Sequence, residues 1–332
     1  MTRLADYTTI GLGGPAGRFV TATTDEELIE AAGDGALILG GGSNLVVADE
    51  GFPGTVVRVA TSGVRFDHAP DDAVDVTVAA GEPWDDVVAA TVGEGLAGLE
   101  CLSGIPGSTG ATPIQNVGAY GSEVAEVITS VKTNDSLLHN DACGFSYRTS
   151  IFKRAPGRYV VLGVTFRLPR SKLSAPIRYA DLAAELGVPL GEQVAAADAR
   201  DAVIAVRRRK GMVTDPTDPD SRSAGSFFTN PVITQAEYEH VSVRSAIPVP
   251  SYDAGEGLVK VPAAWLIEHA GFVKGYAAHG ARISTKHTLA LTNPGSATTA
   301  GLLALARDIR EGVEAAFGVT LTPEPILIGA SL

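Results

Sequence analysis

The chain has 332 residues, of which 45% are hydrophobic, and this is enough apolar material for two or three domains with cores of their own. Its 38 acidic and 26 basic residues give a net charge of −12, which excludes non-specific nucleic-acid binding because that requires a basic surface. The longest apolar run, Tyr159 to Phe166, is far shorter than the roughly 20 residues of a membrane span, and no secretory signal opens the chain, so a cytosolic protein is expected.

The first elements predicted along the chain are a short helix and a strand. Thr24 precedes three acidic residues, which is typical of an N-cap and a first helical turn, so a helix is expected over residues 28–32. Residues 36–39 are expected to form a buried strand. This strand runs into a glycine turn with a polar tip, Gly40, Gly41, Gly42, Ser43 and Asn44.

A strand followed by a glycine-rich turn suits the binding of a phosphate group. The spacing matches neither the Rossmann nor the Walker motif, and a plain hairpin turn would have the same residues. Residues 45–47 resume the apolar pattern after the turn. Further along, a helix is predicted over residues 84–92, and strands over 55–60, 74–80, 128–133 and 159–168. The first half therefore mixes α and β elements without the regular alternation of a doubly wound sheet.

The stretch from Cys101 to Gly121 is a second glycine-rich segment, with five glycines among small hydroxyl and amide side chains. Positions without a Cβ can take positive φ and let an anion approach the backbone N–H groups. An ordinary long loop is the alternative, but loops above roughly 12 to 15 residues in compact domains usually have a function. Two such loops in one half of the chain suggest one extended ligand that is contacted twice.

The two cysteines, Cys101 and Cys143, form no CxxC pair and have no histidine pair nearby. This pattern predicts neither a disulfide framework nor a zinc site, so both are expected to be free thiols and no metal is expected.

The composition of the sequence changes near residue 170. Residues 171–176 resemble a linker, and a polar, proline-rich loop follows at 215–220. The basic run from Arg207 to Lys210 is either a solvated helix end or a site for an anionic small molecule. Helices are predicted over 179–186, 195–210, from 235, over 263–270 and over 297–317, with a strand over 287–291.

Three side chains are candidates for chemistry. Arg148 lies between aromatic and aliphatic residues and is either a structural arginine or a bidentate partner for a carboxylate. Ser226 follows a glycine and precedes two phenylalanines; it is either an ordinary solvated or capping serine or a hydroxyl held beside an apolar wall, and its surroundings do not fit the GxSxG motif. Glu324 lies between two prolines and belongs either to a surface turn or to a fixed carboxylate site.

Six motifs, in order along nearly the whole chain, resemble the UDP-N-acetylenolpyruvoylglucosamine reductase family. They are LGGGSN at 39–44, GIPGSTGATPIQNVGAYG at 104–121, YRTSIFK at 147–153, RRRKG at 207–211, AGSFFTNP at 224–231 and PEPILIG at 323–329. The resemblance implies an α+β flavoprotein with the vanillyl-alcohol-oxidase-type FAD-binding fold. It also implies a cytosolic step of peptidoglycan synthesis, in which NADPH reduces the enolpyruvyl ether of UDP-N-acetylglucosamine to UDP-N-acetylmuramate.

The resemblance also implies a domain organisation. Residues 1–60 and 61–211 would form two FAD-binding subdomains, and a tyrosine loop near 170–190 would cover the substrate. Residues 212–322 would form an α+β domain for the UDP-sugar, and 323–332 would return to the active site. A monomer is the simplest expectation, although the sequence leaves the oligomeric state open.

The family's site residues carry over position by position. Arg148 and Glu324 would stabilise the substrate carboxylate, and Ser226 would donate the proton to the carbon that becomes carbanionic. The substrate would also be bound by Tyr179, Lys210, Asn230 and, more weakly matched, His287, for which an ordinary strand-end histidine is the alternative. Non-covalent FAD would contact Gly40, Gly41, Gly42, Ser43, Asn44, Ile105, Pro106, Gly107, Ser108, Gly110, Ala111, Thr112, Gln115, Asn116, Gly118 and Ala119.

The chain departs from the family in two places. Pro325 and Ile326 replace the residues that commonly follow the glutamate, and the loop over 212–222 is long, which leaves its contacts with substrate open. Two other classes of protein remain as alternatives. One is a flavin oxidase of the same fold that transfers electrons to oxygen, and the other is a UDP-sugar-binding protein without activity.

Overall fold

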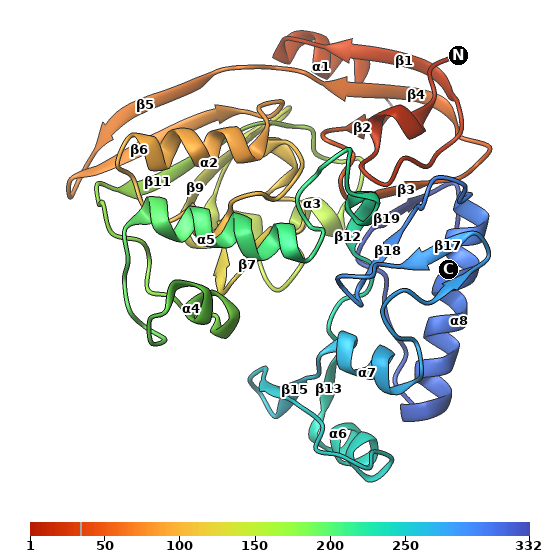
Figure 1. Cartoon of the computed structure of the whole chain (residues 1–332). Helices are drawn as coiled ribbons and strands as arrows, with labels where there is room; N and C mark the ends of the chain where they lie inside the picture. Colours follow the sequence, from red (N-terminus) through yellow and green to blue (C-terminus); the bar gives the residue numbers. More distant parts are fainter. Residues whose placement is uncertain (34) are drawn as a thin grey trace. The chain divides into compact units, whose positions relative to one another are not determined.

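The structure is a computed structural model that describes residues 1–33 and 35–332, and these residues form two compact units (Figure 1). Unit 1 comprises Met1–Pro15, Ser43–Phe52 and Lys210–Leu332. Unit 2 comprises Ala16–Gly42 and Pro53–Arg209. The division expected from the sequence, with boundaries after residues 60, 211 and 322, is finer and stays a prediction.

The first sheet of unit 2 has three strands in the order β1 (Ala16–Ala22), β4 (Phe52–Val59) and β2 (Leu37–Leu39). Helix α1 (Asp25–Ala31) packs on it through the fully buried Leu28. The Thr24 hydroxyl accepts a hydrogen bond from the Glu27 N–H, as an N-cap does. The predicted helix and strand are therefore confirmed.

The main sheet of unit 2 is antiparallel, and a core of Val, Leu and Phe side chains covers it together with Trp84. Its strand order is β10 (Leu137–His139), β9 (Ile128–Thr133), β11 (Val161–Pro169), β6 (Ala73–Ala79) and β5 (Val64–Ala69). The predictions missed β5, an edge strand that exposes five of its six side chains and in which apolar and polar residues alternate only from Val64 to Asp67.

Helices and short elements complete unit 2. Helix α2 (Trp84–Gly93) contributes Trp84 and Val88 to the main core. Helices α4 (Ala180–Leu186) and α5 (Ala196–Arg209) pack on a smaller cluster that includes Cys101. The short elements are α3 (Ile151–Arg154), β7 (Gly118–Ala119), β8 (Ser122–Glu123), η2 (Glu100–Leu102), η3 (Thr109–Ala111), η4 (Val124–Glu126) and η5 (Asn140–Cys143).

Unit 1 is built around one apolar core beneath a four-stranded antiparallel sheet. The sheet has the order β12 (Ser223–Ser226), β18 (Ala290–Thr292), β17 (Ala281–Ile283) and β16 (Ala277–Ala278). Helices α7 (Ala263–His269) and α8 (Thr299–Phe317) contribute their apolar faces to the same core. These two helices match those predicted over 263–270 and 297–317.

Three further groups of elements belong to unit 1. Strands β13 (Val232–Thr234), β15 (Leu258–Lys260) and β14 (Tyr252–Asp253) form a small sheet beside α6 (Gln235–Val243). Strand β3 (Leu45–Val47) pairs in parallel with β19 (Ile326–Ile328), which joins the C-terminal segment to the first glycine turn. The 3-10 helices are η1 (Leu4–Tyr7) and η6 (Pro219–Ser221).

The strand predicted over 287–291 is wrong in its start. The Ser284 hydroxyl accepts hydrogen bonds from the N–H groups of Lys286 and His287. The Ala290 N–H then donates to the His287 carbonyl at 3.1 Å, which closes a turn. The strand therefore begins at Ala290, because local side-chain and turn hydrogen bonds take the backbone groups that a strand would pair.

No helix in the described part of the chain is long and apolar enough to cross a membrane. Both cysteines are free and buried. Burial and the nearby Glu100 raise the pKa of Cys101 to about 11, and burial raises the pKa of Cys143 to about 11. Both thiols are therefore protonated at neutral pH and act as small apolar side chains.

Trp84 joins the main core to the second glycine-rich segment, which yields a first prediction. Its indole N–H donates to the buried Leu102 carbonyl at 3.0 Å. Trp84→Phe keeps a ring in the core but leaves this carbonyl without its donor and creates a small void. We expect unfolding free energy to fall by about 2 kcal/mol in a urea titration followed by circular dichroism.

The matched control for Trp84 is Trp265→Phe, because Trp265 is only half-buried and stacks on His269. Its replacement should cost clearly less unfolding free energy. Equal losses for the two variants would contradict the importance of the indole hydrogen bond.

Candidate functional site

The two glycine-rich segments lie against each other in unit 2. A Cβ at Gly41 would lie 2.5 Å from Cα of Gly107, closer than real side chains approach a backbone. A Cβ at Gly40 would collide with the Ser108 hydroxyl. The contact therefore exists only because Gly41 has no side chain, and the expectation that both loops bind one extended ligand stays a prediction.

The second glycine-rich segment is held rigidly at the end of β6. The N–H groups of Thr109 and Gly110 donate to the carbonyls of Glu82 and Ala80, each at 2.8 Å. A Cβ at Gly110 would lie 2.6 Å from Cβ of Ala80. The loop is thus an ordered backbone surface with few side chains, which suits the close approach of an anionic ligand.

Charged side chains form hydrogen bonds with both the N–H and the carbonyl of Gly104. Its N–H donates to a carboxylate oxygen of Asp85 at 2.6 Å, and its carbonyl accepts from Nε of Arg207 at 3.2 Å. Arg200 forms a bidentate pair with Asp85, with N–O distances of 2.6 and 3.0 Å. This network fixes the start of the glycine-rich stretch, where Gly104 has φ +68°.

The pKa values in this network follow from burial and partners. Burial acts to raise the pKa of Asp85, but hydrogen bonds from Arg200 and Gly104 outweigh it and hold the pKa below its ordinary value of 3.8. Burial lowers the pKa of the Arg207 guanidinium, while Tyr120 and Asp85 act against that change. Arg207 is therefore not the solvated helix end that was one expectation for this basic run.

Asn116 uses its side chain inside the loop. Its Nδ2 donates to Glu123 at 2.6 Å and to the Ser146 carbonyl at 3.3 Å, and its Oδ1 accepts from the Ala125 N–H at 3.1 Å. The Thr112 hydroxyl likewise donates to a carbonyl of its own loop. We expect the Asn116 and Thr112 side chains to shape the cofactor loop, and their direct contact with a ligand stays a prediction.

Arg148 lies beside the end of the second glycine-rich segment. Its Nη2 donates to the Gly118 carbonyl at 2.8 Å, and its own carbonyl accepts from Lys153. Arg148 has φ +54° and Asn116 has φ +47°, a left-handed conformation that costs energy for residues other than glycine. Such strain gathers where the surrounding structure must place a side chain accurately.

Tyr179 is the exposed residue at the N-cap of α4, with 43% of its surface accessible. Its ring meets the ring of Tyr120 edge-on, with centroids 5.4 Å apart. Nearby, the buried carboxylate of Glu100 accepts hydrogen bonds from the N–H groups of Gly98 and Ala175. Through Glu100, the segment that precedes Tyr179 is thus hydrogen-bonded to the residues just before the second glycine-rich segment.

Ser226 and Glu324 come together in unit 1. Ser226 ends strand β12, and the carbonyl of the next residue, Phe227, accepts from the Glu324 N–H at 2.8 Å. The Glu324 carbonyl accepts from the side chain of Asn44, and Ile326 donates to the Asn44 carbonyl at 2.9 Å. The tip of the first glycine turn therefore lies next to the two residues predicted to be catalytic in this unit.

The long loop over 212–222 is anchored by Asp220. Its carboxylate accepts from Thr285 and pairs with Arg282 at 2.9 Å, while Asp218 pairs with Lys286 at 2.7 Å. Burial acts to raise the pKa of Asp220, but the Thr285 and Arg282 contacts hold it below its ordinary value. The sequence left the contacts of this loop open; in the structure, the loop bonds to the residues just before His287.

Lys210 and Asn230 flank this region of the sequence. Lys210 begins the long third segment of unit 1, and a Cβ at the next residue, Gly211, would lie 3.1 Å from Cβ of Asp220. The Oδ1 of Asn230 accepts from the Ala263 N–H at the start of α7. The amide N–H groups of Asn230 are the donors left for the predicted contact with substrate.

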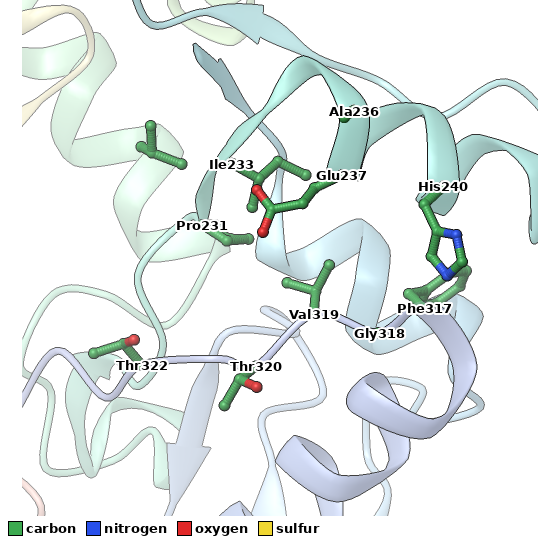
Figure 2. Close-up of a pocket in the computed structure, with 11 residues that line it drawn as sticks. Pro231, Ile233, Ala236, Glu237, His240, Phe317, Gly318, Val319, Thr320 and Thr322 are labelled. Atoms are coloured by element: carbon green, nitrogen blue, oxygen red, sulfur yellow. The ribbon is translucent and has the colours of Figure 1, made fainter.

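A pocket of about 540 Å³ lies beside Asn230 in unit 1, between β13, the start of α6 and the segment after α8 (Figure 2). Its walls include Ile233, Glu237, His240 and Val319. Glu237 already completes the capping box of α6 with Thr234. None of the predicted site residues lines this pocket, so it does not identify the functional site.

The predicted site residues divide between the two units. Unit 2 holds Arg148, Tyr179, the first three glycines and the whole second glycine-rich segment, and unit 1 holds Ser43, Asn44, Lys210, Ser226, Asn230, His287 and Glu324. The predictions missed Asp85, Arg200, Glu100 and Asp220, which belong to none of the six motifs, and Tyr120, which lies within the motif at 104–121 but was assigned no role. Among the described residues no cluster of His, Cys, Asp and Glu suits a metal ion.

Comparison with known proteins agrees with this arrangement. Residues 18–136 match the FAD binding domain model, and residues 215–328 match the model of the C-terminal domain of UDP-N-acetylenolpyruvoylglucosamine reductase. The UDP-N-acetylenolpyruvoylglucosamine reductase of Thermobifida fusca is 56% identical over 99% of this chain and 97% of its own. That of Streptomyces avermitilis is 54% identical over 99% and 94%.

A solved structure is similar over the same length. The crystal structure of UDP-N-acetylenolpyruvylglucosamine reductase from Thermus caldophilus has a TM-score of 0.66 and 26% identity, and the match covers 98% of this chain and 97% of that one. The predicted fold class, α+β with an FAD-binding domain of vanillyl-alcohol-oxidase type and a C-terminal domain, is confirmed. The close backbone contact at Gly41, which a Cβ would prevent, lies within the region that matches an FAD-binding domain.

The contact between the glycine-rich segments yields a second prediction. Gly41→Ala forces the segments apart, and we expect affinity for FAD to fall by about tenfold or more. The measurement is the flavin absorbance that stays with the protein after gel filtration. Gly93→Ala is the control, because Gly93 lies in α2 with open space around its Cα; full retention of flavin by Gly41→Ala would contradict the prediction.

The Asp85 network yields a third prediction, which concerns pH. Because the pKa of Asp85 is depressed in the folded state, its stabilising effect is complete above pH 3.8 and is lost as pH falls through the lower folded value. Asp85→Asn should cost about 1 kcal/mol at pH 7, since the carboxylate is partly exposed. Urea titrations should show this difference shrinking below pH 3.8, whereas the exposed Asp86→Asn should change little at any pH.

Proposed function

The chain belongs to the UDP-N-acetylenolpyruvoylglucosamine reductase family, and we propose that it reduces the enolpyruvyl ether of UDP-N-acetylglucosamine to UDP-N-acetylmuramate with FAD and NADPH. The reaction would be a step of peptidoglycan precursor synthesis in the cytosol. When bound, FAD takes a hydride from NADPH and supplies it to the terminal enolpyruvyl carbon. The tasks left to the protein are to bind the substrate, to stabilise negative charge and to deliver one proton.

One observation carries this proposal above the others. Two side chains of suitable chemistry, Ser226 and Glu324, come from positions 98 residues apart in the sequence (324 − 226) and lie on hydrogen-bonded segments beside Asn44. An unrelated role for these residues would not require them to meet at the tip of a predicted cofactor loop. The same segments belong to the region that matches the C-terminal domain of the family.

The charge that develops on the substrate explains the choice of residues. Hydride addition to the terminal carbon leaves negative charge on the neighbouring carbon and its carboxylate. Arg148 would stabilise that carboxylate with its guanidinium, and Glu324 would hydrogen-bond the same group in its protonated form. Ser226 would give its hydroxyl proton to the carbanionic carbon, which is basic enough to take a proton from a weak acid.

The remaining contacts would hold the UDP-sugar. Lys210 offers a point charge and Tyr179 an exposed phenol for the diphosphate, and Asn230 offers its amide N–H groups. His287 follows a turn that Asp218 and Asp220 tie in place through Lys286 and Thr285, so the structure supports a fixed position for it.

The fourth prediction tests the proton donor. Ser226→Ala should still let NADPH reduce the bound flavin, because that step needs no proton from the serine. Reoxidation of the flavin by UDP-N-acetylglucosamine enolpyruvate should slow by about 100-fold or more, the usual contribution of a general acid. Anaerobic stopped-flow absorbance measures the two half-reactions separately.

Ser242→Ala is the matched control, because it removes a serine hydroxyl that bonds the Tyr238 carbonyl within α6. Unchanged reoxidation in Ser226→Ala would remove this serine from the mechanism. A wild-type protein whose reduced flavin reacts with oxygen to form peroxide, but not with the enolpyruvyl substrate, would contradict the proposed function.

A further inference from the structure

Tyr120 occupies a backbone position that disfavours it. It joins β7 to β8 together with Gly121, and the two residues have φ of +51° and +83°. A two-residue hairpin turn with both φ positive prefers Asn or Gly at its first position, because a larger side chain is strained there. A tyrosine at this place therefore points to a role for its ring and hydroxyl.

The ring of Tyr120 supports the ring of Tyr179. The two planes meet at 86° with centroids 5.4 Å apart, which is a favourable edge-to-face geometry. Tyr120 packs against a buried cluster that includes Cys101 and Ile177, whereas Tyr179 is 43% exposed. Tyr120 is thus the fixed member of the pair, and Tyr179 is the member that a ligand can reach.

The hydroxyl of Tyr120 reaches a second group. It shares a hydrogen bond with Arg207, whose guanidinium is buried and donates from Nε to the Gly104 carbonyl at 3.2 Å. Tyr120 therefore contacts Tyr179 with its ring. With its hydroxyl it contacts Arg207, the side chain that bonds the start of the glycine-rich stretch. Its two ends are chemically distinct, so substitutions can separate them.

We propose that Tyr120 is a positioning residue that holds the Tyr179 ring in place for the diphosphate of a UDP-sugar. The inference rests on the proposed function, in which Tyr179 contacts that diphosphate. The edge-to-face contact limits the rotation of an exposed side chain, so less conformational freedom is lost on binding. Tyr120 itself does not touch the substrate and acts through Tyr179.

The test compares two substitutions at position 120. Tyr120→Asn inserts a residue that the turn prefers but removes the ring, and the KM for UDP-N-acetylglucosamine enolpyruvate should rise by about 3- to 10-fold, the value of one edge-to-face contact. The rate of flavin reduction by NADPH should not change. Tyr120→Phe keeps the ring and should retain a KM close to that of the wild type.

A double-mutant cycle separates positioning from general damage. Tyr179→Leu removes the ring that Tyr120 supports, so adding Tyr120→Asn to it should raise KM no further. Tyr159→Leu is the control, because Tyr159 makes a similar edge-on contact with Phe152, at 5.5 Å, elsewhere in the same unit. Additive effects of Tyr120→Asn and Tyr179→Leu, or an equal rise in KM for Tyr159→Leu, would overturn the inference.

Calorimetric titration with UDP keeps this test apart from that of the proposed function. If the wild type binds UDP but does not turn over the enolpyruvyl substrate, the proposed function fails, and weaker UDP binding by Tyr120→Asn still supports the positioning role. If the wild type turns over the substrate and Tyr120→Asn changes neither KM nor UDP affinity, only the positioning role fails. If the wild type neither binds UDP nor turns over the substrate, both fail.

Discussion

The close contact between Gly41 and Gly107 is the constraint on which the cofactor unit depends. The two backbones can approach this closely only because Gly41 has no side chain, so the chain gives up apolar packing at this point. What it gains is a surface of peptide groups that a dinucleotide can approach. The antiparallel sheet of unit 2 and the helix that contains Trp84 pack beneath this surface and fix its position.

Charged side chains also hold the second glycine-rich segment in place. Asp85 and Arg207 hold the two sides of the Gly104 peptide, and Arg200 compensates the charge of Asp85. Burying an arginine would be unfavourable without such partners, because its charge loses the hydration of water. In an acidic protein these arginines also place positive charge next to a segment that is suited to an anionic ligand.

In unit 1, the C-terminal segment holds the predicted site residues in place. Strand β19 pairs with β3, the strand that follows the first glycine turn, and the residues just before it bond to the end of β12. These pairings connect the last residues of the chain to segments near positions 44 and 226. The segments that carry Glu324 and Ser226 are thereby hydrogen-bonded to each other, an arrangement that no local stretch of sequence could assemble.

The sequence by itself determined the motifs and the elements with strong periodicity. The glycine-rich segments, the helices from Trp84, Gln235 and Thr299, and strands such as Ile128–Thr133 follow from residue types within a few positions. The edge strand β5 was missed because its alternation spans only four residues and it has no buried face. The true start of β18 was missed because local hydrogen bonds form a turn before it.

Only the tertiary structure decided which polar residues support the site. Asp85, Arg200 and Asp220 have partners 19 to 115 positions away, and Tyr120 acts from a strained turn, so no spacing along the chain marks them. Arg207 looked like an exposed helix end because charge is usually solvated, and it proved to be buried because a carbonyl, a phenol and a carboxylate meet it there. Such partners are brought together by packing, which acts across the whole chain and leaves no local pattern.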